Sequence, residues 1–187
     1  MFADQCLTRL AEYKKLKSIL DVGSGTGQHA EILRGNGFNV TTISLKPPAD
    51  IVGDFMAENV GEFDGIWVSH VLEHTLNPHD FLRKCYDTLN ERGVLAITVP
   101  PLKHNVVGGH INLFNMGVLL YRLVLAGFNC KNARVGTYGY NLSVIVEKRG
   151  LTLPRLNMDC GDIAVLKDFF PLEVAQNFDG RIQNVNW

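Results

Sequence analysis

Residues 18–28 read Ser-Ile-Leu-Asp-Val-Gly-Ser-Gly-Thr-Gly-Gln, and the architecture of the chain can be worked out from this stretch. An apolar run leads into an acid, Asp21, and then into three glycines at alternate positions from Gly23 to Gly27. Glycine reaches backbone conformations that other residues avoid, and without a Cβ it lets the backbone come close to a ligand. The stretch therefore predicts a strand, a ligand-binding turn and the start of a helix.

The spacing of the glycines differs from that of dinucleotide-binding turns. Dinucleotide enzymes favour the pattern G-x-G-x-x-G, in which the third glycine allows the helix to pack closely against the strand. Here Gly27 comes one position earlier, and Gln28 takes the place of that glycine. The pattern therefore disfavours a dinucleotide as the ligand.

The bulk properties of the chain are those of a small soluble enzyme. Its 187 residues are 46% apolar and 20% charged, which is enough for one domain with a sizeable core. The net charge of −1 gives no overall attraction to nucleic acid or to an anionic membrane, so we expect neither as a partner. The sequence contains no recognisable signal peptide and no apolar run of about 18 residues.

The four cysteines are far apart and form no C-x-x-C motif; they are Cys6, Cys85, Cys130 and Cys160. This spacing is typical of reduced thiols and argues against a disulfide framework or a zinc site. We therefore expect a cytoplasmic protein.

Strand-like and helix-like segments alternate along residues 1–149, which we expect to form one domain. The expected helices are 3–17, 28–34, 78–89 and 115–126, and the expected strands are 18–22, 38–45, 49–54, 63–71, 93–99, 130–135 and 142–148. Asn77 is the expected N-cap of the helix that Pro78 begins, and 136–141 is the expected hairpin turn. Alternating strands and helices that end in a hairpin indicate an α/β domain with an open, mostly parallel sheet, an antiparallel terminal hairpin and helices on both faces.

Residues 150–187 carry two prolines and no clear periodicity. We expect them to form an irregular C-terminal extension that packs on the same domain, with one helix over 162–170. A lid and a dimer arm are the alternatives for this segment, and the chain is expected to be a monomer or a homodimer.

Four segments, in order along the chain, resemble the motifs of one enzyme family. They are 21–27 (D-V-G-S-G-T-G), 63–74 (F-D-G-I-W-V-S-H-V-L-E-H), 93–100 (G-V-L-A-I-T-V-P) and 109–114 (G-H-I-N-L-F), the last followed by A-G-F at 126–128. Over about residues 16–148 the chain resembles the class I S-adenosylmethionine (SAM) dependent methyltransferases, in particular the small-molecule type with the V-L-E-H motif. The resemblance implies a seven-stranded Rossmann-like sheet, SAM as the cofactor, and methyl transfer to a small molecule, which we expect to accept the methyl group at a hydroxyl.

The resemblance also assigns a cofactor site to the glycine turn and to the ends of the following strands. The implied contacts are Asp21, Gly23, Ser24, Gly25, Thr26, Gly27, Ser44, Leu45, Asp54, Phe55, Ser69 and His70. In the family, the residue that matches Asp54 often bonds the adenine amino group, and Phe55 or Met56 would lie along the ring. The alternative role of Asp54 is that of a helix N-cap.

Ser44 departs from the family at the end of the second strand, where an Asp or Glu usually binds the ribose hydroxyls. A carboxylate is a strong, charge-assisted acceptor, and a serine hydroxyl is a weaker one. Three interpretations stay open. SAM binds through Ser44 or a bridging water; the site is degenerate and the protein is a non-catalytic interaction module; or Lys46 favours the phosphorylated ribose of NADP in an oxidoreductase.

Two histidines are the expected catalytic residues, His110 first and His74 second, because histidine titrates in the range that a general base for a hydroxyl requires. Both fall, with His104, where the family places substrate-side residues. The alternative is structural: His74 closes the segment after a strand, and His110 hydrogen-bonds within its loop.

Residues 70–74 read His-Val-Leu-Glu-His and, with the later His110, partly match the E-x-x-E-H…H cluster of metal-using O-methyltransferases. A histidine, His70, stands where that cluster has its first acid. We therefore expect no metal.

Overall fold

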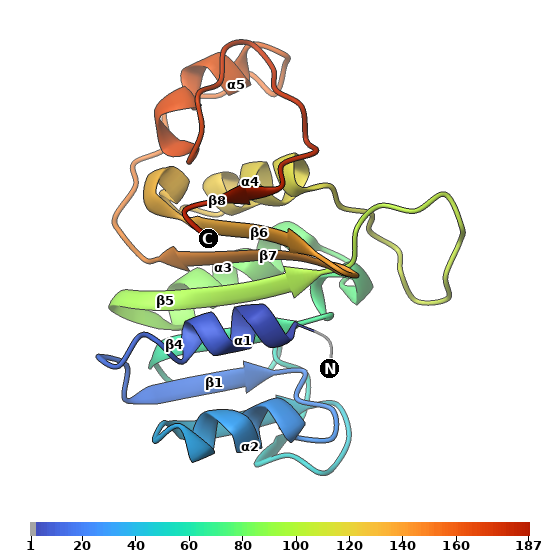
Figure 1. The fold of residues 1–187 in the computed structure, drawn as a ribbon, viewed down its shortest axis with the longest axis vertical. Coiled ribbons are helices and arrows are strands. Elements are labelled where there is room, and N and C mark those ends of the chain that lie inside the picture. Colours follow the sequence, from blue (N-terminus) through green and yellow to red (C-terminus); the bar gives the residue numbers. More distant parts are fainter. Residues whose placement is uncertain (1–2) are drawn as a thin grey trace.

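The computed structural model describes residues 3–187 and contains one eight-stranded sheet (Figure 1). The strands lie in the order β3-β2-β1-β4-β5-β7-β6-β8; neighbours from β3 to β5 are parallel, whereas β7, β6 and β8 pair antiparallel. The strands are β1 (Ser18–Val22), β2 (Asn39–Ser44), β3 (Ile51–Val52), β4 (Phe63–Ser69), β5 (Leu89–Val99), β6 (Arg134–Tyr138), β7 (Asn141–Glu147) and β8 (Asn184–Val185). The expected open, mostly parallel sheet with an antiparallel edge is confirmed, with one strand more than the seven predicted.

Helices cover both faces of the sheet, as expected. They are α1 (Asp4–Leu10), α2 (Gln28–Gly35), α3 (Pro78–Thr88), α4 (Met116–Leu125) and α5 (Asp162–Val165), with three 3₁₀ turns, η1 (Leu72–His74), η2 (Cys130–Asn132) and η3 (Lys167–Phe169). Alternate residues of a strand point to opposite faces, so in β1 Ile19 packs with α1 and α2 while Leu20 packs with α3 and α4. In Figure 1, α1 and α2 lie in front of the sheet and α3 lies behind it. Within residues 3–187, no helix has the length and apolar character needed to cross a membrane.

The strand, turn and helix predicted from residues 18–28 are present. β1 ends at Val22, the turn passes through Gly23, Gly25 and Gly27 at φ values of +74°, +54° and +80°, and α2 begins at Gln28. Residues other than glycine rarely adopt these positive φ values. The three glycines therefore allow the chain to reverse direction tightly between β1 and α2.

α3 begins where the sequence predicted. Asn77 Oδ1 accepts hydrogen bonds from the N–H groups of His79 and Asp80, at 3.2 and 3.3 Å, and Pro78 is the first helical residue. Asparagine supplies an acceptor for N–H groups that lack a partner in the first turn, and proline has no N–H to leave unpaired. The cap fixes where the chain leaves η1 and enters α3.

Several predicted boundaries are wrong. The helix predicted over 3–17 ends at Leu10, because Leu16, the next large buried residue, is six positions on and does not return to the same helix face. The strand predicted over 49–54 is only Ile51–Val52. The strand predicted over 93–99 begins earlier, because Leu89 already pairs with Phe63 of β4.

The terminal hairpin is tighter than predicted. The strand predicted over 130–135 is a 3₁₀ turn followed by β6, and the turn predicted over 136–141 contains only Gly139 and Tyr140. Gly139 adopts a φ of +51°, and Tyr138 pairs with Asn141 across the two-residue loop. A glycine at positive φ permits this short loop, which lengthens both strands.

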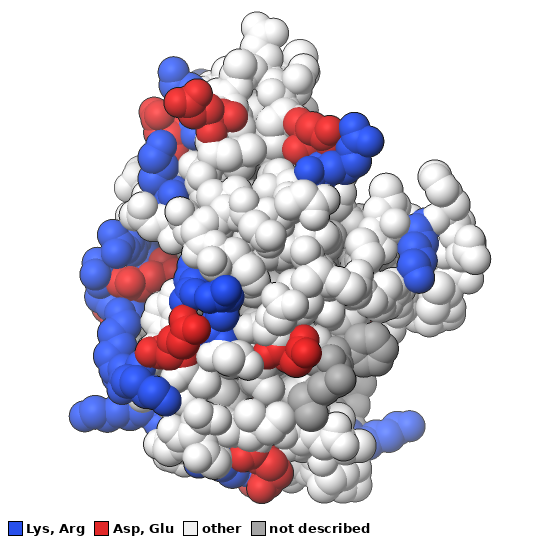
Figure 2. Space-filling model, in the orientation of Figure 1, with Lys and Arg blue, Asp and Glu red and all other residues white. Residues whose placement is uncertain are grey.

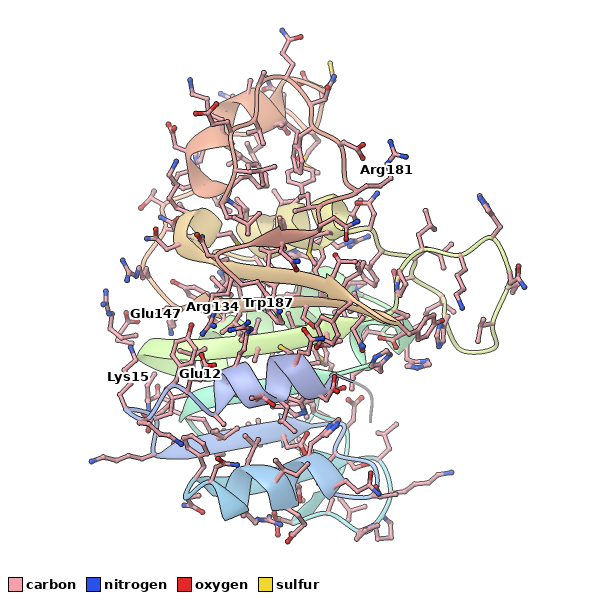
Figure 3. All side chains as sticks on the ribbon, in the orientation of Figure 1. Glu12, Lys15, Arg134, Glu147, Arg181 and Trp187 are labelled. Carbon is pink, nitrogen blue, oxygen red and sulfur yellow. The ribbon has the colours of Figure 1, made fainter. Side chains whose placement is uncertain are left out.

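The segment after β7 packs on α4 and β6. Leu166 and Phe170 are buried in the core, the rings of Phe170 and Phe178 lie 5.1 Å apart between centroids, and β8 pairs with β6. At the chain end Trp187, which Figure 3 labels, stacks on Tyr138, with 5.7 Å between ring centroids. The helix predicted over 162–170 is split into α5 and η3, since so short a segment has little helical stability of its own. The division into a domain at 1–149 and an extension at 150–187 stays a prediction.

Ion pairs connect the chain after α1 to the terminal hairpin. Arg134 Nη1 donates to Glu12 Oε2 at 2.8 Å, and Lys15 Nζ lies 3.5 Å from Glu147 Oε2 (Figure 3). On the face that Figure 2 shows, acidic side chains lie among the basic ones, in keeping with the net charge of −1. Such solvent-exposed pairs contribute little stability each.

Candidate functional site

The carboxyl ends of β1, β2 and β4 open into a cavity of about 460 Å³. Gly23 follows β1, Ser44 ends β2 and Val71 follows β4, and all three line the cavity. Residues of η1 and of the start of α3 complete the lining. Ligands of open α/β sheets bind at this edge, and the volume falls within the roughly 300–1,000 Å³ of small-molecule sites.

The glycine turn is fixed to β2 and faces open space. The N–H groups of Gly23 and Ser24 donate to the carbonyl oxygen of Ile43, at 2.8 and 3.3 Å. A Cβ at Gly23 would collide with the Val71 side chain. A Cβ at Gly25 or Gly27, the outer glycines of the turn, would meet no described heavy atom within 4 Å. The turn therefore leaves room for a bound molecule beside its outer glycines.

Asp21 is a buried carboxylate in β1, with 2% of its surface exposed. Its Oδ2 atom makes no hydrogen bond within residues 3–187, and the buried hydroxyl of Ser24 makes none there either. Burial raises the pKa of Asp21 to about 7, although the positive charge of Arg34 opposes this shift. Burying a carboxylate without donors is unfavourable, and such a shifted pKa is typical of functional sites. A carboxylate near the end of β1 and a hydroxyl in the glycine turn that follows suit a bound ammonium group.

Ser44 lines the cavity, but no acid replaces the missing ribose-binding carboxylate at this point of β2. Asp50, the first acid after Ser44 in the sequence, is already bonded. Its Oδ2 atom accepts from the N–H and the hydroxyl of Thr42, both at 2.8 Å, and from Arg34 Nη2 at 3.0 Å. The hydrogen bonds from Thr42 hold the pKa of Asp50 below its usual value.

Three more predicted cofactor residues, Leu45, Asp54 and Phe55, line the same cavity, together with Met56. Asp54 Oδ1 accepts from the Met56 N–H at 2.9 Å, so Asp54 also caps the turn after β3. Phe55 is buried against Phe81, with 5.4 Å between ring centroids. Phe55 and Met56 give the cavity an apolar wall that suits a flat ring.

The remaining predicted cofactor residues do not line the cavity. These are Asp21, Ser24, Gly25, Thr26, Gly27, Ser69 and His70. The first five belong to β1 and the glycine turn and adjoin Gly23, while Ser69 ends β4 and His70 follows it. Their contacts with a cofactor stay predictions.

His70 faces an acid and the terminal hairpin. Its Nε2 atom lies 3.1 Å from Asn141 Oδ1, which also accepts the N–H of Ala3. Its Nδ1 atom lies 3.4 Å from Glu73 Oε1. Burial alone would lower the pKa of His70, but the interactions with Glu73 and Asn141 outweigh burial and raise it.

Glu73 is fully buried in η1, and neither carboxylate oxygen makes an aligned hydrogen bond within residues 3–187. Its backbone carbonyl oxygen accepts from the N–H groups of Ile111 and Asn112, at 3.0 and 3.1 Å, and Asn112 Nδ2 donates to the carbonyl oxygen of Thr75 at 2.7 Å. The loop between β5 and α4, which extends beyond the sheet in Figure 1, is thereby attached to η1.

The two predicted catalytic histidines lie next to each other. His74 lines the cavity, and the ring of His110 packs edge-on to it, with 4.9 Å between centroids. His74 Nδ1 lies 2.8 Å from the carbonyl oxygen of Gly109. One potential ligand atom from each of Glu73, His74 and His110 falls within 4.8 Å of the others. His104 is exposed and outside this cluster.

Glu73 is the residue that sequence reasoning undervalued, because it entered the analysis only through the partial metal match. The signal was its place directly after Val71 and Leu72, close behind a buried strand. An acid in such a place is either bonded by the fold or reserved for a ligand.

Comparison with known proteins agrees with this geometry. The family described as "Methyltransferase domain" matches residues 2–130. A ubiquinone biosynthesis O-methyltransferase of Glaesserella parasuis is 30% identical over 105 residues, which cover 44% of this chain and 44% of that protein. A second, from Caulobacter vibrioides, is 28% identical over 99 residues, covering 43% of this chain and 39% of that protein. The chain spans less than half the length of these curated relatives.

Solved structures share the fold at low sequence identity. The 1,6-didemethyltoxoflavin-N1-methyltransferase of Burkholderia thailandensis, with bound S-adenosylhomocysteine, has a TM-score of 0.67 and 16% identity, covering 77% of this chain and 76% of that one. A SAM dependent methyltransferase of Archaeoglobus fulgidus has a TM-score of 0.63 and 15% identity, covering 78% and 94%. Human N-acetylserotonin methyltransferase, in complex with SAM, has a TM-score of 0.63 and 14% identity, covering 79% and 52%.

Proposed function

The chain belongs to the methyltransferase-domain family, and on that premise we propose that it transfers the methyl group of SAM to a hydroxyl of a small molecule. Membership in the family identifies SAM as the cofactor. The observation that carries the proposal is Asp21, a buried carboxylate whose Oδ2 has no hydrogen-bond partner among residues 3–187, beside a glycine turn that faces open space.

The described residues fit SAM along its length. The ammonium group of its amino-acid end pairs with the Asp21 carboxylate and the Ser24 hydroxyl, which otherwise stay buried and unbonded. Ser44 takes the ribose, directly or through water, since Asp50 is engaged with Thr42. Asp54 and the apolar wall next to it take the adenine. When bound, SAM supplies an electrophilic methyl group on a sulfonium.

The acceptor lies on the side of η1. Methyl transfer from a sulfonium is an in-line displacement, so the enzyme must orient the acceptor and remove its proton. His74 lines the cavity and His110 stands next to it, so the histidine pair is placed to activate a hydroxyl. His74 lines the cavity and His110 does not, and both stay predictions as catalytic residues. The similarity to O-methyltransferases supports oxygen as the accepting atom.

Calorimetric titration of the purified protein with S-adenosylhomocysteine tests the cofactor site, with NADPH as the control titrant. We expect micromolar binding of S-adenosylhomocysteine and no response to NADPH. Asp21→Ala should weaken binding at least tenfold, whereas Asp87→Asn, which changes an exposed acid on α3, should leave binding unchanged.

Two other results of this titration would contradict the proposal. No binding of either titrant would make the site degenerate, with Ser44 as the lesion, and favour a role in protein interaction. Binding of NADPH alone would favour an oxidoreductase. The small-molecule substrate, the absence of nucleic-acid and membrane partners, the oligomeric state and the cytoplasmic location stay predictions.

A further inference from the structure

A second, smaller space lies under the loop between β5 and α4, next to the histidine pair. Residues of that loop, the prolines that follow β5 and the turn of the terminal hairpin form its walls. His110 lines this space and packs edge-on against His74, which lines the cofactor cavity. The two spaces therefore meet at the histidine pair, as an acceptor site and a cofactor site must if a methyl group is to pass between them.

The walls of the smaller space suit a molecule with an apolar part and one charged group. Pro101, Phe114 and Tyr140 supply apolar surface. Lys103 also lines the space, and its Nζ atom lies over the ring of Tyr140, 4.2 Å from the centroid. An ammonium group is attracted to the face of an aromatic ring, but Lys103 forms no ion pair within residues 3–187. Its charge is therefore available to an anion.

The segment that builds this space contains no acid. No Asp or Glu occurs between Glu91 and Glu147, although the chain has 19 acids in 187 residues. Every residue that lines the smaller space comes from this stretch, and Lys103 is the one Lys or Arg among them. In Figure 2 the loop that projects beyond the sheet carries basic but no acidic side chains. The full charge that an acceptor meets under this loop is positive.

The cofactor cavity has the opposite character. Asp54 and Asp80 line it, and no Lys or Arg of residues 3–187 does. SAM carries a positive sulfonium and a positive ammonium group, so acidic residues suit it. Glu73, the acid to which the β5–α4 loop is attached, has no exposed surface and lies against His70. The two spaces that meet at the histidine pair are thus matched to opposite charges, a cation in one and an anion in the other.

The smaller space must open to admit an acceptor, because its volume of about 10 Å³ accommodates no more than a water molecule. The start and the end of the loop are joined, since the N–H of Leu102 donates to the carbonyl oxygen of Phe114 at 2.7 Å. Residues 103–106 make no backbone hydrogen bond within residues 3–187. This tip can therefore move outward, with Lys103, while the ends of the loop stay in place.

We propose that the acceptor carries a carboxylate or phosphate group, that it binds under the tip of the β5–α4 loop, and that Lys103 selects it by pairing with that group. The hydroxyl of the acceptor then lies at the histidine pair, and its apolar part lies against Tyr140 and Phe114. The proposal deepens the proposed function, on which it rests for the methyl transfer itself. Lys103 determines specificity, and no proton transfer is assigned to it.

Small probe molecules test the charge preference directly. Protein with and without S-adenosylhomocysteine is titrated with benzoate and phenyl phosphate, and with benzamide and phenol as their neutral counterparts, and binding is followed by NMR of the probe. The titrations are made at pH 8, where histidine is ordinarily neutral, so that the lysine supplies the charge. We expect at least one anion to bind roughly fivefold or more tightly than its neutral counterpart, because an ammonium group pairs strongly with an anionic oxygen. Comparison of benzoate with phenyl phosphate then identifies the group that is preferred.

Two matched variants assign the preference to one residue. Lys103→Gln should abolish it and leave the binding of the neutral probes unchanged. Lys131→Gln should alter neither, since Lys131 is an exposed lysine of the same acid-free stretch that precedes β6 at the opposite edge of the sheet. Equal binding of each anion and its neutral counterpart, no binding of either anion, or a preference that survives Lys103→Gln would overturn the proposal.

Calorimetry with S-adenosylhomocysteine separates this proposal from the proposed function. Lys103 does not line the cofactor cavity, so Lys103→Gln should bind S-adenosylhomocysteine as the parent does. Binding of S-adenosylhomocysteine without a charge preference would leave methyl transfer standing and remove the anionic acceptor. A charge preference without binding of S-adenosylhomocysteine would leave an anion site and remove the methyl transfer.

Discussion

Asp21 and Asp64 belong to neighbouring strands, β1 and β4, but their surroundings are opposite. At the amino-terminal edge of the sheet, Asp64 accepts from the N–H groups of Lys17 and Ser18, at 2.9 and 3.2 Å, and from Asn90 Nδ2 at 2.9 Å. These hydrogen bonds, that from Asn90 most of all, hold its pKa below the usual value. Asp21, toward the carboxyl edge, is buried, its Oδ2 accepts no hydrogen bond from the described part of the chain, and its pKa is raised to about 7.

The contrast between Asp64 and Asp21 separates acids that stabilise the fold from acids that are placed to bind a ligand. The carboxylate of Asp64 accepts three hydrogen bonds, which connect β1, β4 and β5, so the fold itself supplies its partners. At the edge where ligands bind, Asp21 Oδ2 and the Glu73 carboxylate make no aligned hydrogen bond within residues 3–187, although His70 lies 3.4 Å from Glu73 Oε1. Both of these acids lie next to the cavity or the histidine pair, which is the arrangement expected of a functional edge.

The largest effect expected from this contrast is the pH dependence of stability at Asp21. Its pKa is about 7 in the folded protein against the usual 3.8 of an aspartate in water, so the folded state binds the proton more tightly. The stabilisation is complete below about pH 4 and is lost as the pH rises to about 7, a loss on the order of 4 kcal/mol. Denaturant unfolding of cofactor-free protein at pH 5 and pH 8 should show about 2.7 kcal/mol of this loss, because the rest is already lost at pH 5, and Asp21→Asn should abolish most of the difference. Equal pH slopes in the two proteins would show that Asp21 is bonded in the folded state.

Asp64→Ala should lower the unfolding free energy at pH 7, whereas removal of the buried Asp21 charge should not. The Asp64→Ala variant leaves three donors without their acceptor, which should cost about 2–3 kcal/mol of unfolding free energy at pH 7. Because Asp64 lies at the far edge from the cavity, the affinity for S-adenosylhomocysteine should stay within about twofold of the parent at temperatures where the variant is folded. Denaturant unfolding and calorimetry on the same preparation check both statements. A large loss of affinity in folded Asp64→Ala protein would contradict the idea that acids at the amino-terminal edge serve only the fold.

The smallest of these effects concerns Ser44. Ser44→Asp restores a charged acceptor at the end of β2 and should tighten S-adenosylhomocysteine binding about tenfold, or about 1.4 kcal/mol, if the ribose lies there. Leu45→Asp, which places the same charge on the next residue, is the matched control and should not tighten it. Unchanged or weaker binding by the Ser44 variant would show that the ribose is held elsewhere in the cavity.

Local sequence signals predicted the parts of the molecule that local physics determines. Alternate glycines gave the turn after β1, and Asn77 with Pro78 gave the start of α3. Of the predicted site residues, Gly23, Ser44, Leu45, Asp54, Phe55 and His74 line the cavity, since strand ends of a parallel sheet meet at one edge.

Those local sequence signals could not predict contacts between segments that are distant in the sequence. The meeting of His110 with His74 depends on hydrogen bonds from the 109–112 loop to the Glu73 carbonyl, which leave no pattern in either segment. The engagement of Asp50 by Thr42 depends on how tightly the chain folds back after β2. β8 is two residues long, too short for any periodicity, and is defined only by its pairing with β6.

Both margins of the sheet end in a two-residue strand, β3 on one side and β8 on the other. An edge strand normally offers a row of unpaired N–H and C=O groups on which another chain can form a strand, and this is how many sheets aggregate or fuse into larger assemblies. Here the outermost strand on each side is only a stub, and beyond β3 the edge of β2 is occupied by Asp50, which accepts the Thr42 N–H, and by Arg34, which donates to the Val40 carbonyl oxygen. The sheet is thus closed to growth without being a barrel, and the protein can expose reactive polar groups at one end of its strands while remaining protected along both sides.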